Sequence, residues 1–272
     1  MEGILTAPFV TEMVDIMTHM YHKGWNERNG GNISYLLDEA EVAKYLDLTH
    51  VTRVFDISFD MSELIGKYFI VTGSGKYFKN VKNHTLEVLG VVRVKNASQL
   101  ELLWGLENGT KPTSELPTHL MSHMARLKVD PLNRVVMHCH ATHLIAMSFA
   151  HSLEEDTLTK TLWEMCTECI VVFHDGIATV PWIVPGTTAI GDATSAKMAQ
   201  ARLVLWPFHG VYGAGRDIDE TYGLIETAEK AAEVYTHMMS QGGKKQTITD
   251  QELQDLADAF GVVPKRGILF RP

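Results

Sequence analysis

The sequence predicts a single α/β domain in which one central sheet is covered by helices. Short apolar runs with the length of strands recur along the chain, and longer segments between them place apolar residues at helical spacing. The 272 residues include 45% hydrophobic and 21% charged residues, as is usual for a globular protein. No repeat, low-complexity tract or change in composition marks a linker, so we expect residues 1–272 to form one domain.

The first half of the chain predicts two helices separated by strands. One helix covers residues 10–21 and ends at Gly24, and the other begins at Glu115. Residues 38–66 have no clear pattern. The apolar runs between the helices predict strands at 33–37, 68–71, 89–94 and 100–103. The apolar side of the second helix consists of Leu116, Leu120, Met124 and Leu127.

The second half of the chain predicts further strands and helices. A buried strand at 134–137 leads into His138, and the helix that follows has Thr142 as a candidate N-cap. Pro207 cannot donate a hydrogen bond to a sheet, so the strand that ends at His209 should bulge or lie at an edge. The other strands are expected at 170–173, 178–184 and 203–208, and the other helices at 188–202 and 218–239.

Charge and hydropathy exclude several classes of partner. The formal net charge is -9 and there is no stripe of lysine and arginine, which argues against nucleic acid and against an anionic membrane surface. No apolar run reaches the ~18 residues of a spanning helix, and the amino-terminal residues do not have the pattern of a signal peptide. We therefore expect a cytoplasmic protein.

Three histidines form a candidate metal site. His138 and His140 flank Cys139 at the end of an apolar strand, so both imidazoles should project from one face and the thiol from the other. An H-x-H pair alone is more simply explained as two hydrogen-bonded histidines, but His209 makes a metal the better interpretation. Three imidazoles with an open fourth position are typical of catalytic zinc. His143 is expected to be a surface or capping residue.

The cysteines predict no chemistry. Three cysteines make a poor disulfide framework, which agrees with a cytoplasmic location. Cys166 and Cys169 form a C-x-x-C pair, but a zinc ribbon would need a second such pair. We interpret them as buried thiols at the start of the strand expected at 170–173.

Three loops have the composition of an anion site. Glycines and small side chains let backbone amides approach an anion, and a helix N-terminus favours negative charge. For either of the first two loops taken alone, a hairpin turn is the commoner explanation. The second is not a Walker A loop, because it is too short and Tyr77 replaces the required Ser or Thr. Glu115 follows the third loop, either close to the bound group or as a favourable first-turn carboxylate. The loops are Asn29-Gly30-Gly31-Asn32, Gly73-Ser74-Gly75-Lys76 and Thr113-Ser114.

Five short sequence motifs, in a fixed order along the chain, contain the candidate metal and anion residues and extend over most of the sequence. They are GWNERNGGN at 24–32, TGSGK at 72–76, PTSELP at 112–117, MHCHAT at 137–142 and LWPFHG at 205–210. Together they resemble the class II, zinc-dependent aldolases, which share a fold with ribulose-phosphate 4-epimerases and adducin head domains. Within that family the similarity is greatest to the rhamnulose-1-phosphate aldolases. The resemblance implies a central, mainly antiparallel sheet covered by helices.

The resemblance also implies roles for individual residues. His138, His140 and His209 would bind one zinc ion per subunit, and Glu115 would be the acid/base carboxylate. Gly31 would bring a backbone amide to the enediolate, and Glu168 would be a second functional carboxylate, supplied by a neighbouring subunit of a fourfold homotetramer. The positions that match the phosphate site are Asn29, Asn32, Ser74, Gly75 and Ser114.

The activity implied is reversible cleavage of a sugar phosphate, L-rhamnulose 1-phosphate, to dihydroxyacetone phosphate and L-lactaldehyde. Zinc held by neutral imidazoles would stabilise the enediolate that bond cleavage leaves. A 4-epimerase acting on L-ribulose 5-phosphate and a metal-free interaction module of the same fold are the alternatives. The extra segment 38–66 and the P-T-S-E block favour an aldolase, and the retained histidines argue against a module without metal.

Overall fold

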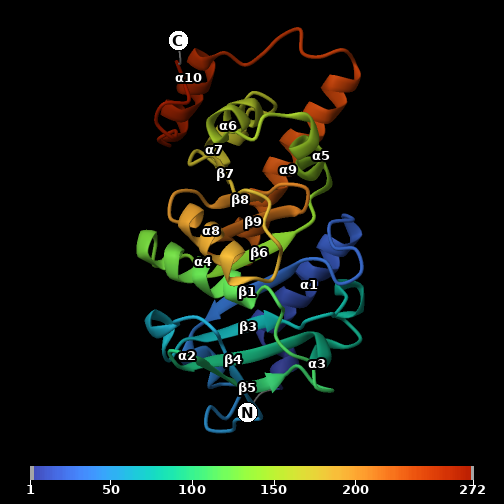
Figure 1. Cartoon of the computed structure of the whole chain (residues 1–272), viewed down its shortest axis with the longest axis vertical. Coiled ribbons are helices and arrows are strands. Elements are labelled where there is room, and N and C mark those ends of the chain that lie inside the picture. The colour runs from blue at the N-terminus through green and yellow to red at the C-terminus, as the bar shows by residue number, and fades with distance from the viewer. Residues whose placement is uncertain (1–2, 271–272) are drawn as a thin grey trace.

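The computed structural model describes residues 3–270 and arranges them around one sheet (Figure 1). Within this range nine strands pair in the order β2-β5-β4-β3-β1-β6-β9-β8-β7, and all pairs are antiparallel except β7 with β8. The predicted fold class, α/β with a mainly antiparallel sheet, is confirmed. The strands are β1 Asn32–Leu37, β2 Arg53–Asp56, β3 Tyr68–Thr72, β4 Leu89–Asn96, β5 Gln99–Gly105, β6 Val135–Cys139, β7 Ile177–Thr179, β8 Leu203–Trp206 and β9 Gly210–Gly215.

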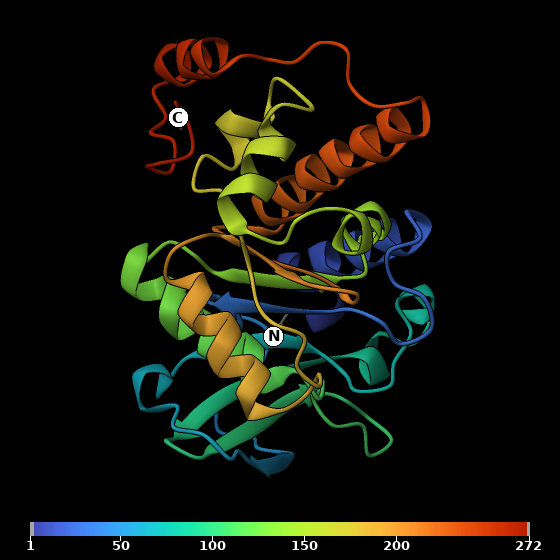
Figure 2. The ribbon, with the colours of Figure 1, turned by 45° about the horizontal axis from the view of Figure 1, so that its top comes forward.

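Helices cover both faces of this sheet (Figure 2). On one face α4 and α8 pack against each other, and Leu116 and Leu120 of α4 share a buried cluster with Phe69 of β3. On the other face α1 and α9 contribute to the largest core cluster. The helices are α1 Pro8–His22, α2 Glu39–Val42, α3 Thr85–Val88, α4 Leu116–Val129, α5 Thr142–Ala150, α6 Glu155–Trp163, α7 Cys169–Val172, α8 Thr188–Met198, α9 Ile218–Ser240 and α10 Asp250–Phe260. Short 3-10 turns lie at Ile4–Thr6, Ser62–Leu64 and Phe78–Asn80.

Strand β6 alternates its side chains between these two layers. Met137 and Cys139 belong to the core cluster that contains α1 and α9, whereas Val136 belongs to the cluster under α8. His138 therefore faces the α4 side of the sheet. The predicted orientation of Cys139 into the opposite layer is confirmed, and burial raises the pKa of its thiol.

Two predicted strands in the second half are wrong or too long. Residues 170–173 do not join the sheet, because Cys169–Val172 forms one helical turn that packs against α10. A short apolar run does not distinguish a buried strand from a buried helical turn. The strand expected at 178–184 is limited to Ile177–Thr179, and Pro181 and Pro185 lie in the loop that follows. Of the two C-x-x-C thiols, Cys169 is buried and Cys166 is partly exposed.

The expectations for Pro207 and Thr142 also need correction. Pro207 lies in the turn between β8 and β9, so it neither bulges nor borders the sheet, and β8 is flanked on both sides. Thr142 does not cap α5. Instead, the buried carboxylate of Glu229 on α9 accepts hydrogen bonds from the backbone amides of His143 and Leu144, at 2.9 Å each. His143 itself is partly buried and bonds to Glu229 through Nδ1.

Residues 38–66 form α2, the edge strand β2 and a 3-10 turn. β2 pairs with β5, so the segment that had no clear sequence pattern completes one border of the sheet. The helices expected at 10–21, 188–202 and 218–239 are confirmed as α1, α8 and α9, with α8 ending at Met198. None of the helices within residues 3–270 has the length and apolar character needed to cross a membrane.

Two histidines on α4, His119 and His123, are completely buried. Their burial should make the free energy of unfolding depend on pH. Burial lowers the pKa of His119 and of His123 from 6.5 to about 3, so both are neutral in the folded protein. The unfolded chain binds their protons below pH 6.5, and the stability present above that pH is lost as the pH falls toward 3. Between pH 8 and pH 5 the loss should be about 2 kcal/mol per histidine.

We therefore expect the free energy of unfolding of His123→Phe to fall by about 2 kcal/mol less than that of wild type between pH 8 and pH 5. The reason is that the variant lacks one of these protonation sites. Urea unfolding at both pH values measures the difference. His22→Phe, on an exposed histidine, is the control and should behave as wild type. Equal losses in wild type and His123→Phe would contradict a neutral, buried His123.

Candidate active site and metal centre

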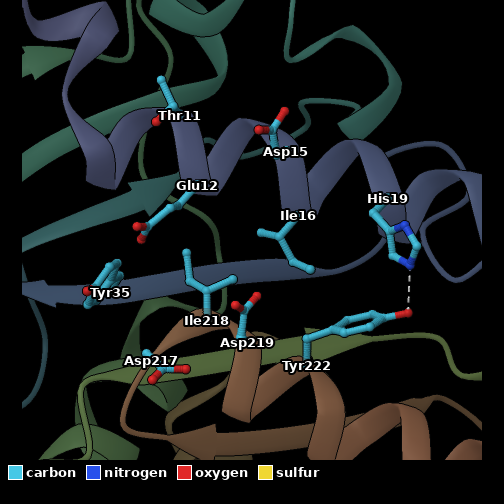
Figure 3. A pocket seen from close by; sticks show the side chains of 10 residues that line it. All are labelled: Thr11, Glu12, Asp15, Ile16, His19, Tyr35, Asp217, Ile218, Asp219 and Tyr222. Atoms are coloured by element: carbon cyan, nitrogen blue, oxygen red, sulfur yellow. Dashed lines mark hydrogen bonds between the residues drawn. The ribbon is translucent and has the colours of Figure 1, made fainter.

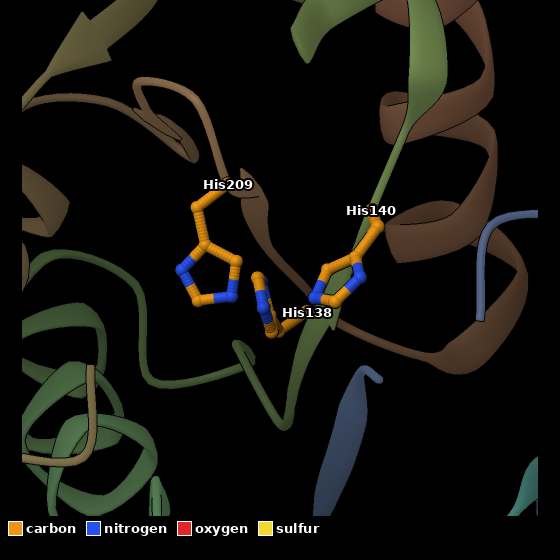
Figure 4. Close-up of side chains that lie close together, drawn as sticks. All are labelled: His138, His140 and His209. Carbon is orange, nitrogen blue, oxygen red and sulfur yellow. The ribbon is translucent and has the colours of Figure 1, made fainter. Parts of the chain in front are cut away.

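The three predicted metal ligands meet at one end of the central strands (Figure 4). His138 lies on β6, His140 follows that strand, and His209 lies in the turn before β9. The pairing of His138 with Tyr212 brings this turn beside the end of β6. One ring nitrogen from each histidine lies within 4.8 Å of the others. The structure thus brings together the set that the sequence predicted.

His138 is held with one nitrogen free. Nδ1–H donates to the carbonyl oxygen of Val211 at 3.0 Å, which leaves Nε2 with its lone pair. This buried Nε2 has no hydrogen-bond partner among the described residues. Burial, and then the neighbouring His209 and His140, lower the pKa of His138 well below 6.5, so the ring stays neutral. A neutral imidazole with an unpartnered, inward-facing nitrogen is suited to metal coordination.

His140 is oriented by a carboxylate. Its Nδ1–H donates to Oε1 of Glu27 at 2.8 Å, so that Nε2 again remains available, and this carboxylate–histidine pair is common around bound metals. The backbone N–H of His140 donates to Trp25 at 2.8 Å. A Cβ on Gly30 would lie 2.6 Å from Cε1 of His140, so only glycine allows the loop to approach the ring this closely.

His209 is placed by a tight turn. Phe208 has φ 65, a left-handed conformation that is uncommon for a residue with a side chain, and the N–H of His209 donates to Trp206 at 3.1 Å. Burial lowers the pKa of His209 as well. Three imidazoles, one of them buried with an unpartnered nitrogen, fit a divalent metal that retains an open position.

Glu115 lies beside this cluster at the N-terminus of α4. It is 8% exposed, and its Oε2 accepts hydrogen bonds from Asn32 Nδ2 at 2.9 Å and from Tyr212 OH at 2.6 Å. The same oxygen is 3.8 Å from Nε2 of His138. Burial raises the pKa of Tyr212 well above 10, so the phenol remains a donor. Within residues 3–270, Oε1 has no hydrogen-bonding partner, so that oxygen is available to a ligand.

The predicted anion loops lie side by side at the same end of the sheet. The N–H of Ser74 donates to Lys111 at 2.8 Å, and the N–H of Thr113 donates to Thr72 at 2.9 Å. Because β3 pairs with β1, this pair of loops lies next to the Asn29–Gly31 loop that precedes β1. The Nζ atom of Lys76 forms an ion pair with Oε2 of Glu87 at 2.8 Å. Gly31 and Gly75 have positive φ, and the exposed members of the set are Asn29, Ser74, Gly75 and Ser114.

Asn32 differs from the other predicted phosphate ligands. Its side chain is 6% exposed, Nδ2 donates to Glu115, and Oδ1 contacts Nε2 of His119. Both ends of the amide are therefore occupied by protein groups. Its predicted contact with phosphate stays a prediction, but its contacts in the structure are with Glu115.

Glu168 is not brought to this site within one chain. It is exposed at the start of α7, where its Oε2 accepts from Cys166 Sγ at 2.8 Å. It lines a pocket of about 320 Å³ together with Lys23, Trp25 and Glu229. Its predicted role in catalysis, as a group supplied by a neighbouring subunit, therefore stays a prediction.

Several residues of the site were missed in the sequence. Glu27 and Tyr212 each bond to a site residue from a distant part of the chain, and the sequence alone does not pair them. The signal for His119 was present, because Glu115, His119 and His123 recur every four residues and so share one side of α4. The sequence analysis interpreted the apolar side of this helix and did not interpret the spacing of the histidines.

A second pocket does not include the three histidines in its lining. Figure 3 shows the residues that line it. This groove of about 780 Å³ is lined by α1 and the start of α9, and His19 contacts Tyr222 OH at 2.9 Å across it. Asp217 follows the end of β9 that pairs with the start of β6, opposite to the end that carries His138. Four carboxylates line the groove, from Glu12, Asp15, Asp217 and Asp219, so it is unsuited to a phosphorylated ligand.

Comparisons with known proteins agree with this arrangement. A rhamnulose-1-phosphate aldolase of Enterococcus faecalis is 62% identical over 268 residues, covering 98% of this chain and 96% of the relative. One of Listeria monocytogenes is 60% identical, covering 98% of both chains. The solved structure of a sugar-phosphate aldolase from Thermotoga maritima matches with a TM-score of 0.76 and 30% identity, covering 86% of this chain and 96% of that one.

The family comparison covers the same region as the sheet and the site. Residues 11–236 match the model described as Class II Aldolase and Adducin N-terminal domain, and this range includes all three histidines, Glu115 and the anion loops. The resemblance found in the five sequence motifs is thereby confirmed. The chain belongs to the family of class II aldolases and adducin N-terminal domains.

Proposed function

We propose that this chain is a rhamnulose-1-phosphate aldolase, which cleaves L-rhamnulose 1-phosphate reversibly to dihydroxyacetone phosphate and L-lactaldehyde. The observation that carries the chemistry is the convergence of His138, His140 and His209 beside the buried carboxylate of Glu115. The sugar is taken from relatives that are about 60% identical over nearly the whole chain. These relatives favour a lyase over a 4-epimerase or a non-enzymatic module.

The three histidines hold the metal in this proposal. The family implies a divalent ion, and we infer zinc, one per subunit, because three neutral imidazoles with an open position are typical of catalytic zinc. When bound, the metal supplies Lewis-acid stabilisation of the negative charge that develops as C3–C4 of the sugar phosphate breaks. Glu27 keeps the His140 ring in the tautomer that presents Nε2, and Val211 does the same for His138.

Glu115 is the proton-transfer group of the proposal. Cleavage requires removal of the proton from the C4 hydroxyl, and the electrons of the C3–C4 bond then remain on the dihydroxyacetone fragment. Oε2 of Glu115 already accepts two hydrogen bonds, so the proton moves to Oε1. The same carboxyl then returns a proton to C3 of the fragment, which completes dihydroxyacetone phosphate and restores the carboxylate. The rigid contacts of Oε2 with Asn32 and Tyr212 keep the carboxylate near the histidines.

The phosphate is assigned to the exposed loops. Asn29, Ser74, Gly75 and Ser114 lie at the end of the sheet that carries the histidines, and their amides and hydroxyls are uncharged donors suited to an anion. We keep Gly31 as the backbone amide nearest the reacting carbons. Binding the phosphate there orients the reacting part of the substrate.

The assembly is also part of the proposal. We infer a cytoplasmic homotetramer in which Glu168 of one subunit reaches the site of the next. The exposed position of Glu168 is compatible with this role. Sedimentation of the purified protein tests the tetramer directly.

The zinc-loaded protein is expected to release dihydroxyacetone phosphate from L-rhamnulose 1-phosphate, and chelation should abolish this release until zinc is restored. His140→Ala should lose the metal yet unfold cooperatively, because the ion is catalytic and does not hold the fold together. Metal analysis and a coupled assay measure both effects. L-ribulose 5-phosphate, which should not be epimerised, is the control substrate. Full activity of metal-free protein would refute the proposal.

Replacing the proton-transfer group should separate chemistry from metal binding. Glu115→Gln keeps an oxygen that can accept from Asn32 and Tyr212 but removes the base, so kcat should fall ~10²- to 10⁴-fold while zinc stays bound. Glu101→Gln, at a buried carboxylate paired with Arg93 outside the site, is the matched control and should change stability without changing kcat. Near-normal turnover of zinc-loaded Glu115→Gln would remove Glu115 from the mechanism.

The anion loops should affect substrate binding. Asn29→Ala and Ser74→Ala should each raise KM for the phosphorylated substrate by about one to two decades, because a hydrogen bond to a charged group contributes about 1.5 to 3 kcal/mol. Ser98→Ala, in the exposed turn between β4 and β5, is the control. Wild-type kinetics in both loop variants would mean that these loops are only turns.

A further inference from the structure

A chain of buried hydrogen bonds runs from Glu115 into the interior of the protein. Oε2 of Glu115 contacts Asn32 Nδ2 at 2.9 Å, and Asn32 Oδ1 contacts His119 Nε2. His119 Nδ1 contacts Ser34 Oγ at 2.8 Å, and the same hydroxyl contacts His123 Nε2 at 2.8 Å. Asn32 and Ser34 lie on β1, His119 and His123 lie on α4, and Glu115 is the N-cap residue of α4.

The chemistry of each group determines which partner donates in each of these hydrogen bonds. A carboxylate oxygen only accepts, so Asn32 must present its Nδ2 to Glu115 and its Oδ1 to His119. Nε2 of His119 must then carry the hydrogen. Because His119 is neutral, its Nδ1 is unprotonated and accepts from the hydroxyl of Ser34. Ser34 in turn accepts from Nε2–H of His123, which is also neutral.

We propose that His119 is a positioning residue for the reaction: its Nε2–H fixes the orientation of the Asn32 amide, so that Asn32 donates to Glu115. An amide can rotate by half a turn with little change in shape. In the rotated form Oδ1 would face the carboxylate and repel it. His119 prevents that rotation, because the rotated Nδ2 would meet the Nε2–H donor.

Burial makes this constraint strong. His119, His123 and Ser34 are at most 1% exposed, so water does not compete for their hydrogen bonds. Ser34 keeps His119 in the Nε2–H tautomer by donating to Nδ1. His123 lies behind Ser34, and within residues 3–270 its ring is hydrogen-bonded to Ser34 and not to Asn32 or Glu115. Its removal therefore leaves the donation from Ser34 to His119 intact.

The inference rests on the proposed function for its kinetic test. His119→Phe removes the donor, so kcat should fall about tenfold or more while KM and zinc content change by less than about threefold. His119→Gln should recover most of kcat, because Gln Nε2 lies near the position of His Nε2 and is also a donor. The matched control is His123→Phe, which empties an equally buried imidazole one turn along α4 and should keep kcat within about threefold of wild type.

The variants separate positioning from stability. If His119→Phe and His123→Phe lower kcat equally, or if neither lowers it, His119 is only a core residue and the inference fails. If His119→Gln is no better than His119→Phe, a donor at this position does not matter and the inference also fails. Melting temperatures identify any loss of kcat that comes from unfolding.

A second measurement does not depend on the substrate. Neutron diffraction from deuterium-exchanged crystals of the full chain should show deuterium on Nε2 of His119 and on the Asn32 nitrogen that faces Glu115, with none on Nδ1 of His119. Deuterium on Nδ1, or an oxygen of Asn32 facing Glu115, would overturn the inference. An inactive wild type with the expected neutron map would instead count against the proposed substrate alone.

Discussion

The site depends on the register of three neighbouring strands. Asn32 of β1 pairs with His138 of β6, and His138 pairs with Tyr212 of β9, so these three residues form one row across the sheet. All three side chains point to the face covered by α4. Glu115 lies over this row, with a donor on each side from Asn32 and Tyr212 and with His138 at 3.8 Å. A slip of one residue in either pairing would turn part of the row into the opposite layer.

This row is costly to bury unless its polar groups are satisfied. An ionised carboxylate in an apolar layer is destabilising when its oxygens lack donors, and the penalty is several kcal/mol. Here Oε2 receives two donors, and Tyr212 stacks on His138 with ring centroids 4.4 Å apart, which excludes water between them. The unpartnered groups that remain, Nε2 of His138 and Oε1 of Glu115, are those that the proposed chemistry uses. Among Glu115 and the three residues of this row, the side-chain groups left without a partner within residues 3–270 are thus those at the reacting positions.

The sequence predicted those parts of the site that depend on local pattern. Alternation along an apolar strand placed His138 and His140 together and Cys139 opposite, and the structure confirms it. The partners of Glu115 depend on which strands become neighbours, and no local pattern states that β1, β6 and β9 are adjacent. The same limit explains Glu229, because the residue that satisfies the start of α5 lies more than 80 positions away on α9. The strand predicted at 170–173 is wrong for another reason, because four consecutive apolar residues fit a helical turn as well as a strand.

The hydrogen bonds that connect Glu115 to His123 form because four residues of a helix and two residues of a strand advance by nearly the same distance. Four residues of α4 advance about 6 Å, and two residues of β1 advance about 6.8 Å. Asn32 and Ser34 therefore stay opposite Glu115, His119 and His123 over two successive steps, and each strand residue lies between two helix residues. The other side of the same helix carries Leu116 and Leu120 into the core beside β3. The apolar side fixes the distance of α4 from the sheet, and that distance allows the polar side to form an unbroken set of hydrogen bonds to Glu115.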